Sequence, residues 1–448
     1  MKPPLKPPAY EALLSDYALR LSSIMQLHTE GVLAHGHYLH WDELRHRAPP
    51  EQLDHRSWWL AVKLTRRMQA RSVPGLLDQA QRPFAYALTD RVLATLHRLD
   101  SEASGRIVLP DPVVNTATRD RYLFSSLVEE AITSSQLEGA STTRQVAREM
   151  LRTQRPPRDK SEQMIWNNYH AMETIRTMAK EPLTLAGLLE LQRIVTDKTL
   201  PDASTAGRLQ TPDEERVCVV DHKTARVLHI PPPAHELPER VAAMVEFANA
   251  PDSTERFIHP VVRAIVLHFW LAYDHPFVDG NGRTARALFY WSMLRRGYWL
   301  FEFLSISSIL HRAPAQYAGA FLKTETDDND LTYFLLYQLE VIERSLEALV
   351  TYLNDKAQQA WRVEKLLQGS VELNHRQIAL LAHAIRHPGF IYSFKSHQTS
   401  HRIAYATARA DLLDLANRGL LEQREVSAKA FIFQAPDDFE ERLRACAR

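Results

Sequence analysis

Cysteine is almost missing from this sequence: only Cys218 and Cys446 occur among 448 residues. Two cysteines so far apart exclude a disulfide framework and a cysteine-rich zinc site, and they fit a reducing compartment. Glycine is also scarce, with 14 residues in the whole chain. Because glycine weakens helices and strands, its scarcity favours long regular elements.

An excess of charge and a membrane-spanning segment are missing as well. Lysine plus arginine number 54, and aspartate plus glutamate also number 54. This balance gives no general attraction to nucleic acid or membranes, so any such role is local. The densest apolar run, residues 264–273, is interrupted by His268 and too short to cross a bilayer. Residues 1–10 contain four prolines and no apolar core, unlike a signal peptide. We therefore expect a soluble cytoplasmic protein that does not bind membranes.

Helical periodicity covers most of the chain, so the expected fold class is mainly α. The length indicates about three domains. Composition shifts place a helical N-terminal extension at residues 1–110, a middle domain at 111–362 and a C-terminal domain with short strands at 363–448. The apolar spacing predicts helices at Tyr10–Met25, Trp58–Gln69, Ala85–Leu99, Arg121–Leu137, Gln145–Leu151, Glu162–Met178, Leu185–Thr196, Pro238–Phe247, Val261–Tyr273, Thr284–Arg296, Tyr333–Asn354 and Val363–Gln368.

One short segment between two predicted helices combines chemical groups that a fold does not need. It reads His275-Pro-Phe-Val-Asp-Gly-Asn-Gly-Arg-Thr-Ala-Arg286. Gly280 and Gly282 let backbone N–H groups turn inward as an anion nest, and the following helix start adds its positive end. Arg283 and Arg286 are three residues apart and can lie on one helix face. The segment therefore predicts a binding site for more than one phosphate.

Two further residues of this segment predict chemistry at the bound phosphates. Asp279 is a hard oxygen ligand that suits Mg²⁺, an ion that keeps most of its waters and needs few protein ligands. His275 suits removal of a proton from an attacking hydroxyl, because histidine ordinarily titrates near neutral pH. Together they indicate phosphoryl or nucleotidyl transfer. A lone Asp-Gly-Asn-Gly is usually only a turn, but six functional residue types at fixed spacing between two helices favour the chemical interpretation.

This segment resembles the core motif of the Fic family, His-Pro-Phe-x-Asp/Glu-Gly-Asn-Gly-Arg-x-x-Arg, without a mismatch. The resemblance implies a helical Fic fold and transfer of AMP from ATP to a protein hydroxyl, with pyrophosphate leaving. It implies that His275 is the base and Asp279 the Mg²⁺ ligand. It also implies that Asn281 and the neighbouring N–H groups hold the α-phosphate. Arg283 and Arg286 would hold the β- and γ-phosphates. The related Doc branch, which phosphorylates, lacks the Gly-Asn-Gly-Arg arrangement, although some family members use other nucleotide-like donors.

A second segment, Ser134-Ser-Gln-Leu-Glu138-Gly139, ends a helix predicted over about 121–138. Gly139 stands where the glycine after a helix is expected. A glutamate at the negative end of a helix is either solvated or compensated by a positive group. The segment resembles the Fic inhibitory motif Ser/Thr-x-x-x-Glu-Gly/Asn, with Ser134 and Glu138 at its two fixed positions. The resemblance implies that Glu138 pairs with Arg286 and keeps the γ-phosphate from its productive pose.

A β-hairpin is predicted over Val217–Ile230, where two β-prone runs flank the polar turn 221–225. It resembles the Fic flap, which implies that an extended target segment docks there by strand pairing. A plain surface hairpin is the alternative. Gly207-Arg-Leu-Gln210 departs from the Gly-x-aromatic-Arg pattern of many relatives, and this departure leaves the flap geometry and its target contacts open.

The C-terminal part is similar to a winged helix-turn-helix. Helices are predicted at Arg376–Ile385 and, with a turn near Ile403, at Thr399–Arg418, followed by wing strands at Leu420–Arg424 and Ala430–Gln434. Residues 371–436 carry eight basic and five acidic side chains, a net charge of +3. Such a module binds DNA or contacts protein, and both remain open.

Other histidines are interpreted as structural. His35 and His40 belong to a histidine-rich segment in which metal binding and packing are both conceivable, and we favour packing. His259 and His268 are expected to pack and orient the loop that follows them.

The leading hypothesis is a self-inhibited protein adenylyltransferase that uses ATP and Mg²⁺, modifies itself as well as a target, and forms a homo-oligomer. One alternative is a DNA-binding regulator whose Fic domain senses a nucleotide. Others are a Fic enzyme that removes AMP, with Glu138 positioning a water, and one with a different nucleotide donor.

Overall fold

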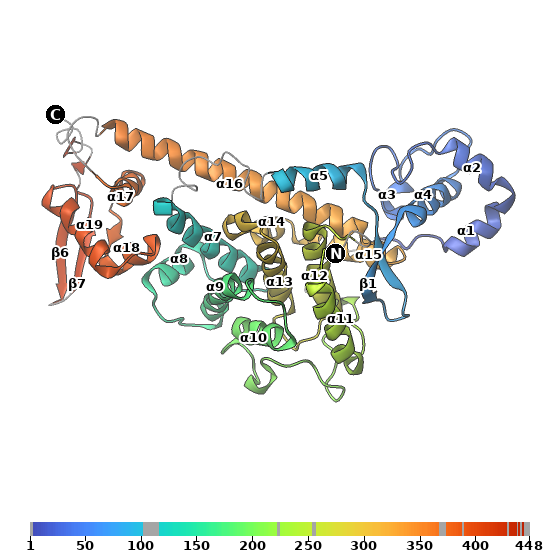
Figure 1. The fold of residues 1–448 in the computed structure, drawn as a ribbon, viewed down its shortest axis with the longest axis horizontal. Coiled ribbons are helices and arrows are strands. Elements are labelled where there is room, and N and C mark those ends of the chain that lie inside the picture. The colour runs from blue at the N-terminus through green and yellow to red at the C-terminus, as the bar shows by residue number, and fades with distance from the viewer. Residues whose placement is uncertain are drawn as a thin grey trace. The chain divides into compact units, whose positions relative to one another are not determined.

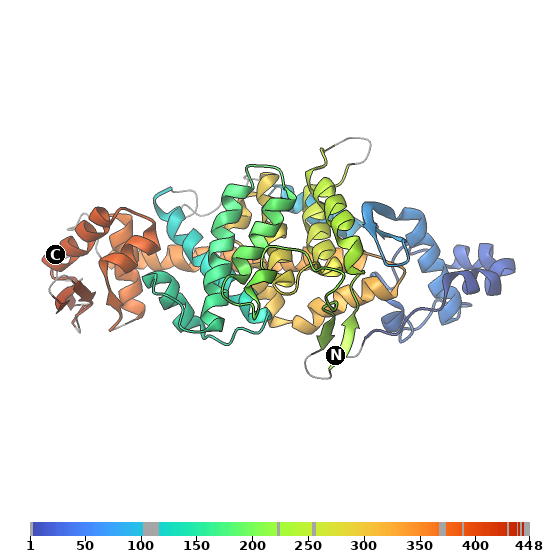
Figure 2. The ribbon, with the colours of Figure 1, turned by 90° about the horizontal axis from the view of Figure 1, so that it is seen from below.

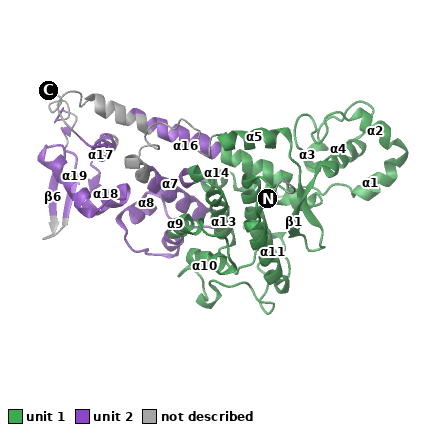
Figure 3. Ribbon diagram, in the orientation of Figure 1, with its two compact units in different colours: residues 1–105, 170–301, 306–343 green, residues 106–169, 302–305, 344–448 purple. Residues whose placement is uncertain are grey.

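The chain forms two compact units, each assembled from separate stretches of sequence (Figure 3). The computed structural model describes residues 3–101, 116–221, 225–252, 257–366, 373–387, 389–427, 430–436, 438–439 and 441–442. Cys446, the hairpin residues 222–224, the expected boundary near residue 110 and the end of the helix expected at Val363–Gln368 lie outside these ranges. Unit 1 comprises residues 1–105, 170–301 and 306–343, and unit 2 comprises 106–169, 302–305 and 344–448. The division at about 110 and 362 stays a prediction.

The fold is mainly helical, as the sequence predicts, with short antiparallel strands (Figure 1). No helix among the described residues combines the length and the apolar stretch that crossing a bilayer requires.

Two buried helices form the centre of unit 1 (Figures 1 and 2). α12 (Pro260–Asp274) and α13 (Asn281–Arg295) pack against each other, and nearly all their residues are buried. Helices that are buried all round are core helices, because every face must find a partner. α10 (Leu185–Thr196) packs on α13, and α11 (Leu237–Asn249) packs on α12. The loop of interest connects the two central helices and is therefore fixed at both ends.

The N-terminal segment of unit 1 has its own apolar cluster around α4 (His55–Gln69). Trp58 and Trp59 of this helix are buried. The cluster also includes residues of α1 (Tyr10–Tyr17), α2 (Leu21–Leu27) and α3 (Trp41–Leu44). His40 is buried and caps α3, and His35 packs edge-on against Trp58 with ring centroids 5.1 Å apart. The expectation that these histidines pack is confirmed.

The N-terminal extension is not wholly helical, contrary to the prediction. β1 (Arg71–Leu77) and β2 (Pro83–Tyr86) form a hairpin, and α5 (Asp90–Ser101) begins later than the helix expected from Ala85. Gly75 of β1 has φ +79°, and an added Cβ there would lie 3.2 Å from the Trp270 ring. The strands are fixed by contact with distant α12, which a local apolar period does not report.

The remaining helices of unit 1 surround this core. α14 (Ile306–Arg312) and α15 (Pro314–Thr326) pack together, and α16 (Thr332–Leu366) contributes residues to both units. Lys63 of α4 forms a buried ion pair with Asp327, with Nζ and Oδ1 2.5 Å apart. A buried pair of this kind is costly to break, because the remaining charge loses its compensation.

Unit 2 contains α7 (Thr116–Leu137), α8 (Arg144–Thr153) and the start of α9 (Lys160–Met178). α7 ends in a Schellman motif. The Ala140 N–H donates to the Ser135 carbonyl (3.0 Å) and the Gly139 N–H to the Gln136 carbonyl (3.1 Å). Gly139 has φ +93°, so the sequence placed the helix end correctly.

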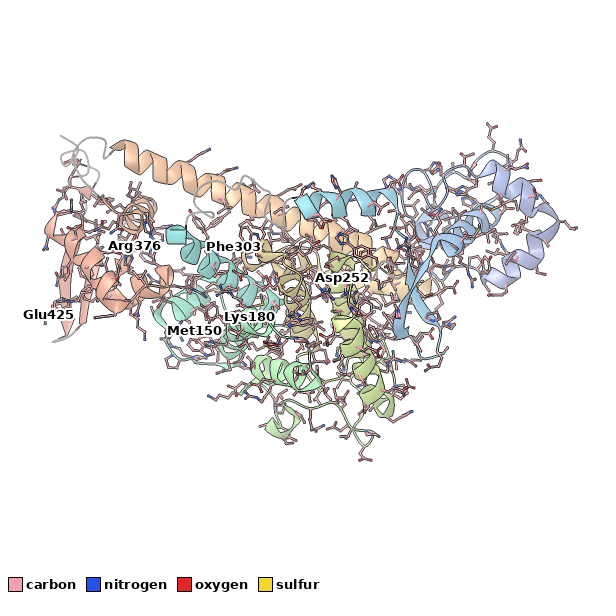
Figure 4. All side chains as sticks on the ribbon, viewed as in Figure 1. Met150, Lys180, Asp252, Phe303, Arg376 and Glu425 are labelled. Atoms are coloured by element: carbon pink, nitrogen blue, oxygen red, sulfur yellow. The ribbon has the colours of Figure 1, made fainter. Side chains whose placement is uncertain are left out.

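The C-terminal elements of unit 2 share a separate apolar core. They are α17 (His375–Arg386), α18 (Phe394–His401), α19 (Tyr405–Asn417) and the sheet of β5 (Ile391–Tyr392), β7 (Ala430–Gln434) and β6 (Glu422–Ser427) in that order. Arg376, labelled in Figure 4, pairs with Asp411 of α19 at 2.6 Å. α17, α19 and β7 lie where the sequence predicts them, and β6 is displaced by two residues from the predicted strand. α18 begins at Phe394, five residues before the predicted start at Thr399, and β5 was not expected. Assignment as a winged helix, and its use for DNA, stay predictions.

Candidate functional site

The site begins where α12 ends. His275 is the C-cap residue, with φ 47° and ψ 53°, and its N–H donates to the Leu271 carbonyl at 3.0 Å. A non-glycine residue in this left-handed region is strained, and such strain persists only where surrounding contacts fix it. The chain therefore leaves the helix at a defined angle, and His275 stands at the corner.

The ring of His275 has a definite orientation. Its Nδ1 lies 3.3 Å from the Ala272 carbonyl oxygen, and the residue is half-buried. A carbonyl oxygen only accepts, so this contact requires that Nδ1 carries the proton. In the neutral ring Nε2 is then the basic nitrogen, which is the form that a proton acceptor needs.

The loop is closed by a side-chain amide. Asn281 Oδ1 accepts from the Phe277 N–H at 2.9 Å, and Asn281 Nδ2 donates to the Phe277 carbonyl at 2.8 Å. Phe277 is fully buried and anchors the loop in the core. Both ends of the Asn281 amide therefore bind the backbone of the loop.

Gly280 precedes α13 and approaches α10 closely. Its φ is +83°, and an added Cβ would lie 2.7 Å from Thr196 Cγ2. Only glycine meets both requirements, the left-handed backbone and the close contact. The N–H groups at the start of α13 therefore remain directed out of the helix end, where an anion is favoured.

Both arginines of the motif are buried. Arg283 and Arg286 are each 1% exposed. Arg283 Nη1 donates to the Val195 carbonyl at 2.6 Å, and its Nη2 lies 3.4 Å from Asp279 Oδ1. Arg286 lies near His268, and burial together with the Arg286 charge lowers the pKa of His268 to about 3. His268 is thus neutral and binds the Tyr317 hydroxyl at 2.7 Å, a structural role as expected.

Asp279 is the most open charged group of the loop, with 45% of its side chain exposed. Oδ1 accepts from the Gly280 N–H at 2.5 Å and faces Arg283. Across the described part of the chain, no three or more His, Cys, Asp or Glu side chains gather as a metal site. One open carboxylate at this loop nevertheless fits Mg²⁺, whose other ligands would be oxygens of a bound phosphate and water.

Several residues that sequence reasoning missed hold this loop in place. Gln192 of α10 donates to the Asp279 carbonyl at 3.0 Å. Asp274, fully buried, pairs with Arg240 of α11 at 2.7 Å and accepts from the Trp270 indole at 2.9 Å. Burial raises the pKa of Asp274 above its usual value, although Arg240 opposes the shift. The only signal in the sequence for this contact was that a charged residue, Asp274, directly precedes His275.

Arg216 and His229 hold the same loop from the other side. Arg216 donates to the carbonyls of Asp274 (2.8 Å) and His275 (3.2 Å). His229 Nε2 lies 2.7 Å from the Tyr273 carbonyl. Neither residue was singled out from the sequence, because the contacts join positions 59 and 44 residues apart.

Residues 182–293 match the model of the Fic/DOC family. These residues form a Fic domain. The match includes α10 to α13 and the whole loop from His275 to Arg286, which the sequence motif had indicated.

Curated proteins with sequences similar to part of this chain are also named as Fic proteins. Proteins called Protein adenylyltransferase Fic are 32% identical over 118 residues in Nematostella vectensis and 29% identical over 148 residues in Drosophila melanogaster. The matches cover 26% and 33% of this chain, and 24% and 27% of those relatives. This chain therefore matches about a quarter of the length of these relatives.

Solved structures of Fic proteins are also similar. A Fic family protein from Desulfovibrio desulfuricans G20 aligns with 79% of this chain and 98% of its own, at 17% identity and a TM-score of 0.48. Fic-1 from C. elegans aligns over 59% of this chain and 72% of its own, at 20% identity and a TM-score of 0.44.

The predicted hairpin of the Fic domain is present. β3 (Val219–Asp221) and β4 (Arg226–His229) pair antiparallel, with a register shift between Val219 and Val220. Three apolar side chains on or beside the strands are exposed: Val220, Val227 and Ile230.

Ser134 and Glu138 lie in unit 2, whereas the loop from His275 to Arg286 lies in unit 1. Ser134 is buried in α7, and Glu138 is the exposed C-cap residue of that helix. The pairing of Glu138 with Arg286 stays a prediction.

Proposed function

We propose that this protein is an adenylyltransferase that transfers AMP from ATP to a hydroxyl side chain of a protein. Three observations support the proposal. Residues 182–293 match the Fic/DOC family, and curated relatives of that region are named adenylyltransferases. The observation that carries most weight is the half-buried His275, whose Nδ1 contact with the Ala272 carbonyl leaves Nε2 as the base.

In the proposed reaction the target hydroxyl oxygen attacks the α-phosphorus of ATP. A bond forms between that oxygen and phosphorus, and the bond from the α-phosphorus to the bridging oxygen of pyrophosphate breaks. The hydroxyl proton passes to Nε2 of His275, and pyrophosphate leaves. The backbone N–H groups of Asn281 and Gly282 and the Arg283 and Arg286 guanidinium groups would hold the negative oxygens in place, while the Gly280 N–H donates to Asp279. Positioning and charge neutralisation supply most of the rate in such transfers.

Asp279 would hold Mg²⁺, which supplies charge neutralisation at the phosphates. Its open position and its short bond to the Gly280 N–H fix the carboxylate at the loop where phosphate would bind. Only one protein ligand is required, because Mg²⁺ at phosphates keeps several waters.

We also propose that the resting protein is inhibited by Glu138. A carboxylate that pairs with Arg286 would compete with the γ-phosphate for the same guanidinium group. Two features support the idea: the match of Ser134 to Glu138 with the inhibitory motif, and the exposed position of Glu138 directly after the last residue of α7.

The exposed apolar residues of the β3–β4 hairpin would receive an extended segment of the target protein. Strand addition satisfies backbone groups of an edge strand, and neighbouring apolar side chains add specificity. Self-modification and a homo-oligomer are part of the same proposal.

The test is to incubate Glu138→Gly with ATP labelled at the α- or the γ-phosphate in parallel, with Mg²⁺. Label from the α position alone supports AMP transfer. Label from the γ position would show a kinase, and the proposal would fail. Label from neither would favour a nucleotide sensor or another nucleotide donor. Label that is lost from a pre-modified protein would indicate removal of AMP.

A further inference from the structure

The last carbonyl groups of α12 are bound by side chains of the hairpin segment. Carbonyls at a helix C-terminus have no partner within the helix, and they form its negative end. Here Tyr273, Asp274 and His275 offer three successive carbonyls. His229 contacts the first at 2.7 Å, and Arg216 donates to the second at 2.8 Å and to the third at 3.2 Å. All these residues belong to unit 1.

Arg216 connects both ends of the hairpin to the helix. It precedes β3, and its Nε donates to the carbonyl of Pro232, which follows β4, at 2.8 Å. Its Nη1 also donates to Gln210 Oε1. Burial lowers the pKa of Arg216, with the Asp274 charge opposing, yet a guanidinium group stays protonated. This partly buried cation has an acceptor at each of its three nitrogens, which offsets its loss of water. Gln210, like Leu209, is also a position at which the chain departs from the Gly-x-aromatic-Arg pattern.

His229 has acceptors at both ring nitrogens. Nδ1 lies 2.7 Å from Glu325 Oε2, and Nε2 lies 2.7 Å from the Tyr273 carbonyl. Neither partner has a proton to donate when Glu325 is ionised, so the imidazolium form satisfies both contacts. Burial lowers the pKa of His229, but the hydrogen bond and charge of Glu325 outweigh it, and the net shift is upward. The other charge near this ring is Asp274, which acts in the same direction.

We propose that Arg216 and His229 are positioning residues, through which the β3–β4 hairpin holds His275 in its left-handed conformation. The inference rests on the proposed function, because it concerns the orientation of the base. His275 has φ 47°, a strained backbone that needs outside support. Its own carbonyl and the two before it receive that support from one hairpin. The element that would receive the target therefore also orients the base.

The main test compares Arg216→Gln with Arg208→Gln in the Glu138→Gly background. Arg208 lies in the same segment, but it pairs with Glu214 at 2.6 Å and donates to the carbonyls of Ser204 and Leu209 instead of those of residues 273–275. For Arg216→Gln we expect kcat to fall about 10- to 100-fold, the usual cost of a displaced catalytic group, with KM for ATP within about twofold. Arg208→Gln should retain both parameters. Equal kcat in the two variants would overturn the proposal.

A second pair of variants tests His229 by conservative rescue. Gln places its amide nitrogen near ring Nε2 and can still donate to the Tyr273 carbonyl. Asn places its amide near Nδ1 and reaches only toward Glu325. We expect His229→Gln to keep more of kcat than His229→Asn. The reverse order, or no difference, would show that the Tyr273 contact does not position His275.

A measurement without catalysis separates this inference from the proposed function. Amide hydrogen exchange of the peptide covering residues 275–282 should become faster in Arg216→Gln and stay unchanged in Arg208→Gln. If no variant transfers label from ATP, the proposed function fails, while faster exchange in Arg216→Gln still supports the positioning role of Arg216. Unchanged exchange in Arg216→Gln overturns that positioning role even when the parent protein transfers AMP.

Discussion

Among the described helices that are followed by a residue in the left-handed conformation, α7 and α12 have ends that are built differently. α7 is followed by Gly139 at φ +93°, and its last carbonyls accept from the N–H groups of the chain that follows. α12 is followed by His275 at φ 47°, and its last carbonyls accept from Arg216 and His229, which are distant in sequence. The first end is closed by local backbone bonds and the second by tertiary contacts.

The difference indicates what each end does. A Schellman end with glycine forms wherever the chain allows it and leaves Glu138 exposed at the tip. The end of α12 has a histidine at a position where glycine would be less strained. Two contacts from Arg216 and one from His229 hold this end in place. A chain keeps such strain where a side chain must stand in one place. In our account, the end of α7 carries the proposed inhibitory residue Glu138, and the end of α12 carries the proposed base His275.

The largest effect is expected from removing the base. His275→Ala in the Glu138→Gly background should lower transfer of α-label about 10²- to 10⁴-fold, the usual contribution of general base catalysis. Binding of a non-hydrolysable ATP analogue should change little, because the phosphate-binding groups remain. Titration of the analogue into both proteins provides the control. Undiminished transfer would show that His275 is not the base.

Removing the proposed inhibitory carboxylate should increase label transfer, whereas removing the base decreases it. Glu138→Gly is expected to raise self-labelling by at least about tenfold, equivalent to about 1.4 kcal/mol. Glu138→Gln should show most of the rise, since the charge is what pairs with Arg286. Gln136→Gly weakens the same helix end without touching the carboxylate, and its labelling should equal that of the wild type. Equal labelling by all four proteins would remove the inhibitory helix from the account.

Gly139 and Gly280, which both have positive φ, extend the comparison to crowding around the backbone. Gly280→Ala adds a Cβ that meets Thr196 at 2.7 Å, whereas Gly139→Ala meets nothing within 4 Å. Both substitutions pay the left-handed strain of about 1 kcal/mol, but only Gly280→Ala adds crowding, for a total of about 2–4 kcal/mol. Urea unfolding gives both values. Equal losses would mean that the contact of Gly280 with α10 relaxes freely.

The smallest effect concerns pH, because it depends on one ionisable group. Glu325 raises the pKa of His229 in the folded state. A raised folded pKa stabilises the protein fully below the unfolded pKa, and this stability is lost as pH rises through the folded pKa. Thermal stability of the wild type should therefore fall as the pH rises above about 6.5, the ordinary pKa of histidine, and that of His229→Gln should fall less. Parallel curves would show that His229 is not charged in the folded protein.

The sequence predicted the position of the loop well, but it did not predict the residues that hold the loop in place. The loop from His275 to Arg286 and the glycine end of α7 are local patterns, and the structure has both where the residues indicated them. Asn281 differs in detail, since its side chain closes the loop on Phe277. The hairpin β1–β2 was missed because contact with α12 determines it. Arg216 and His229 were missed for the same reason, since an isolated arginine or histidine has no period that reveals a distant carbonyl.

The most direct test of the central claim is the intact mass of Glu138→Gly after incubation with ATP and Mg²⁺. We expect a gain that corresponds to AMP, at a hydroxyl side chain that fragmentation can locate. The Glu138→Gly, His275→Ala protein should show no gain. A gain of phosphate alone, or an AMP gain that persists without His275, would contradict the account.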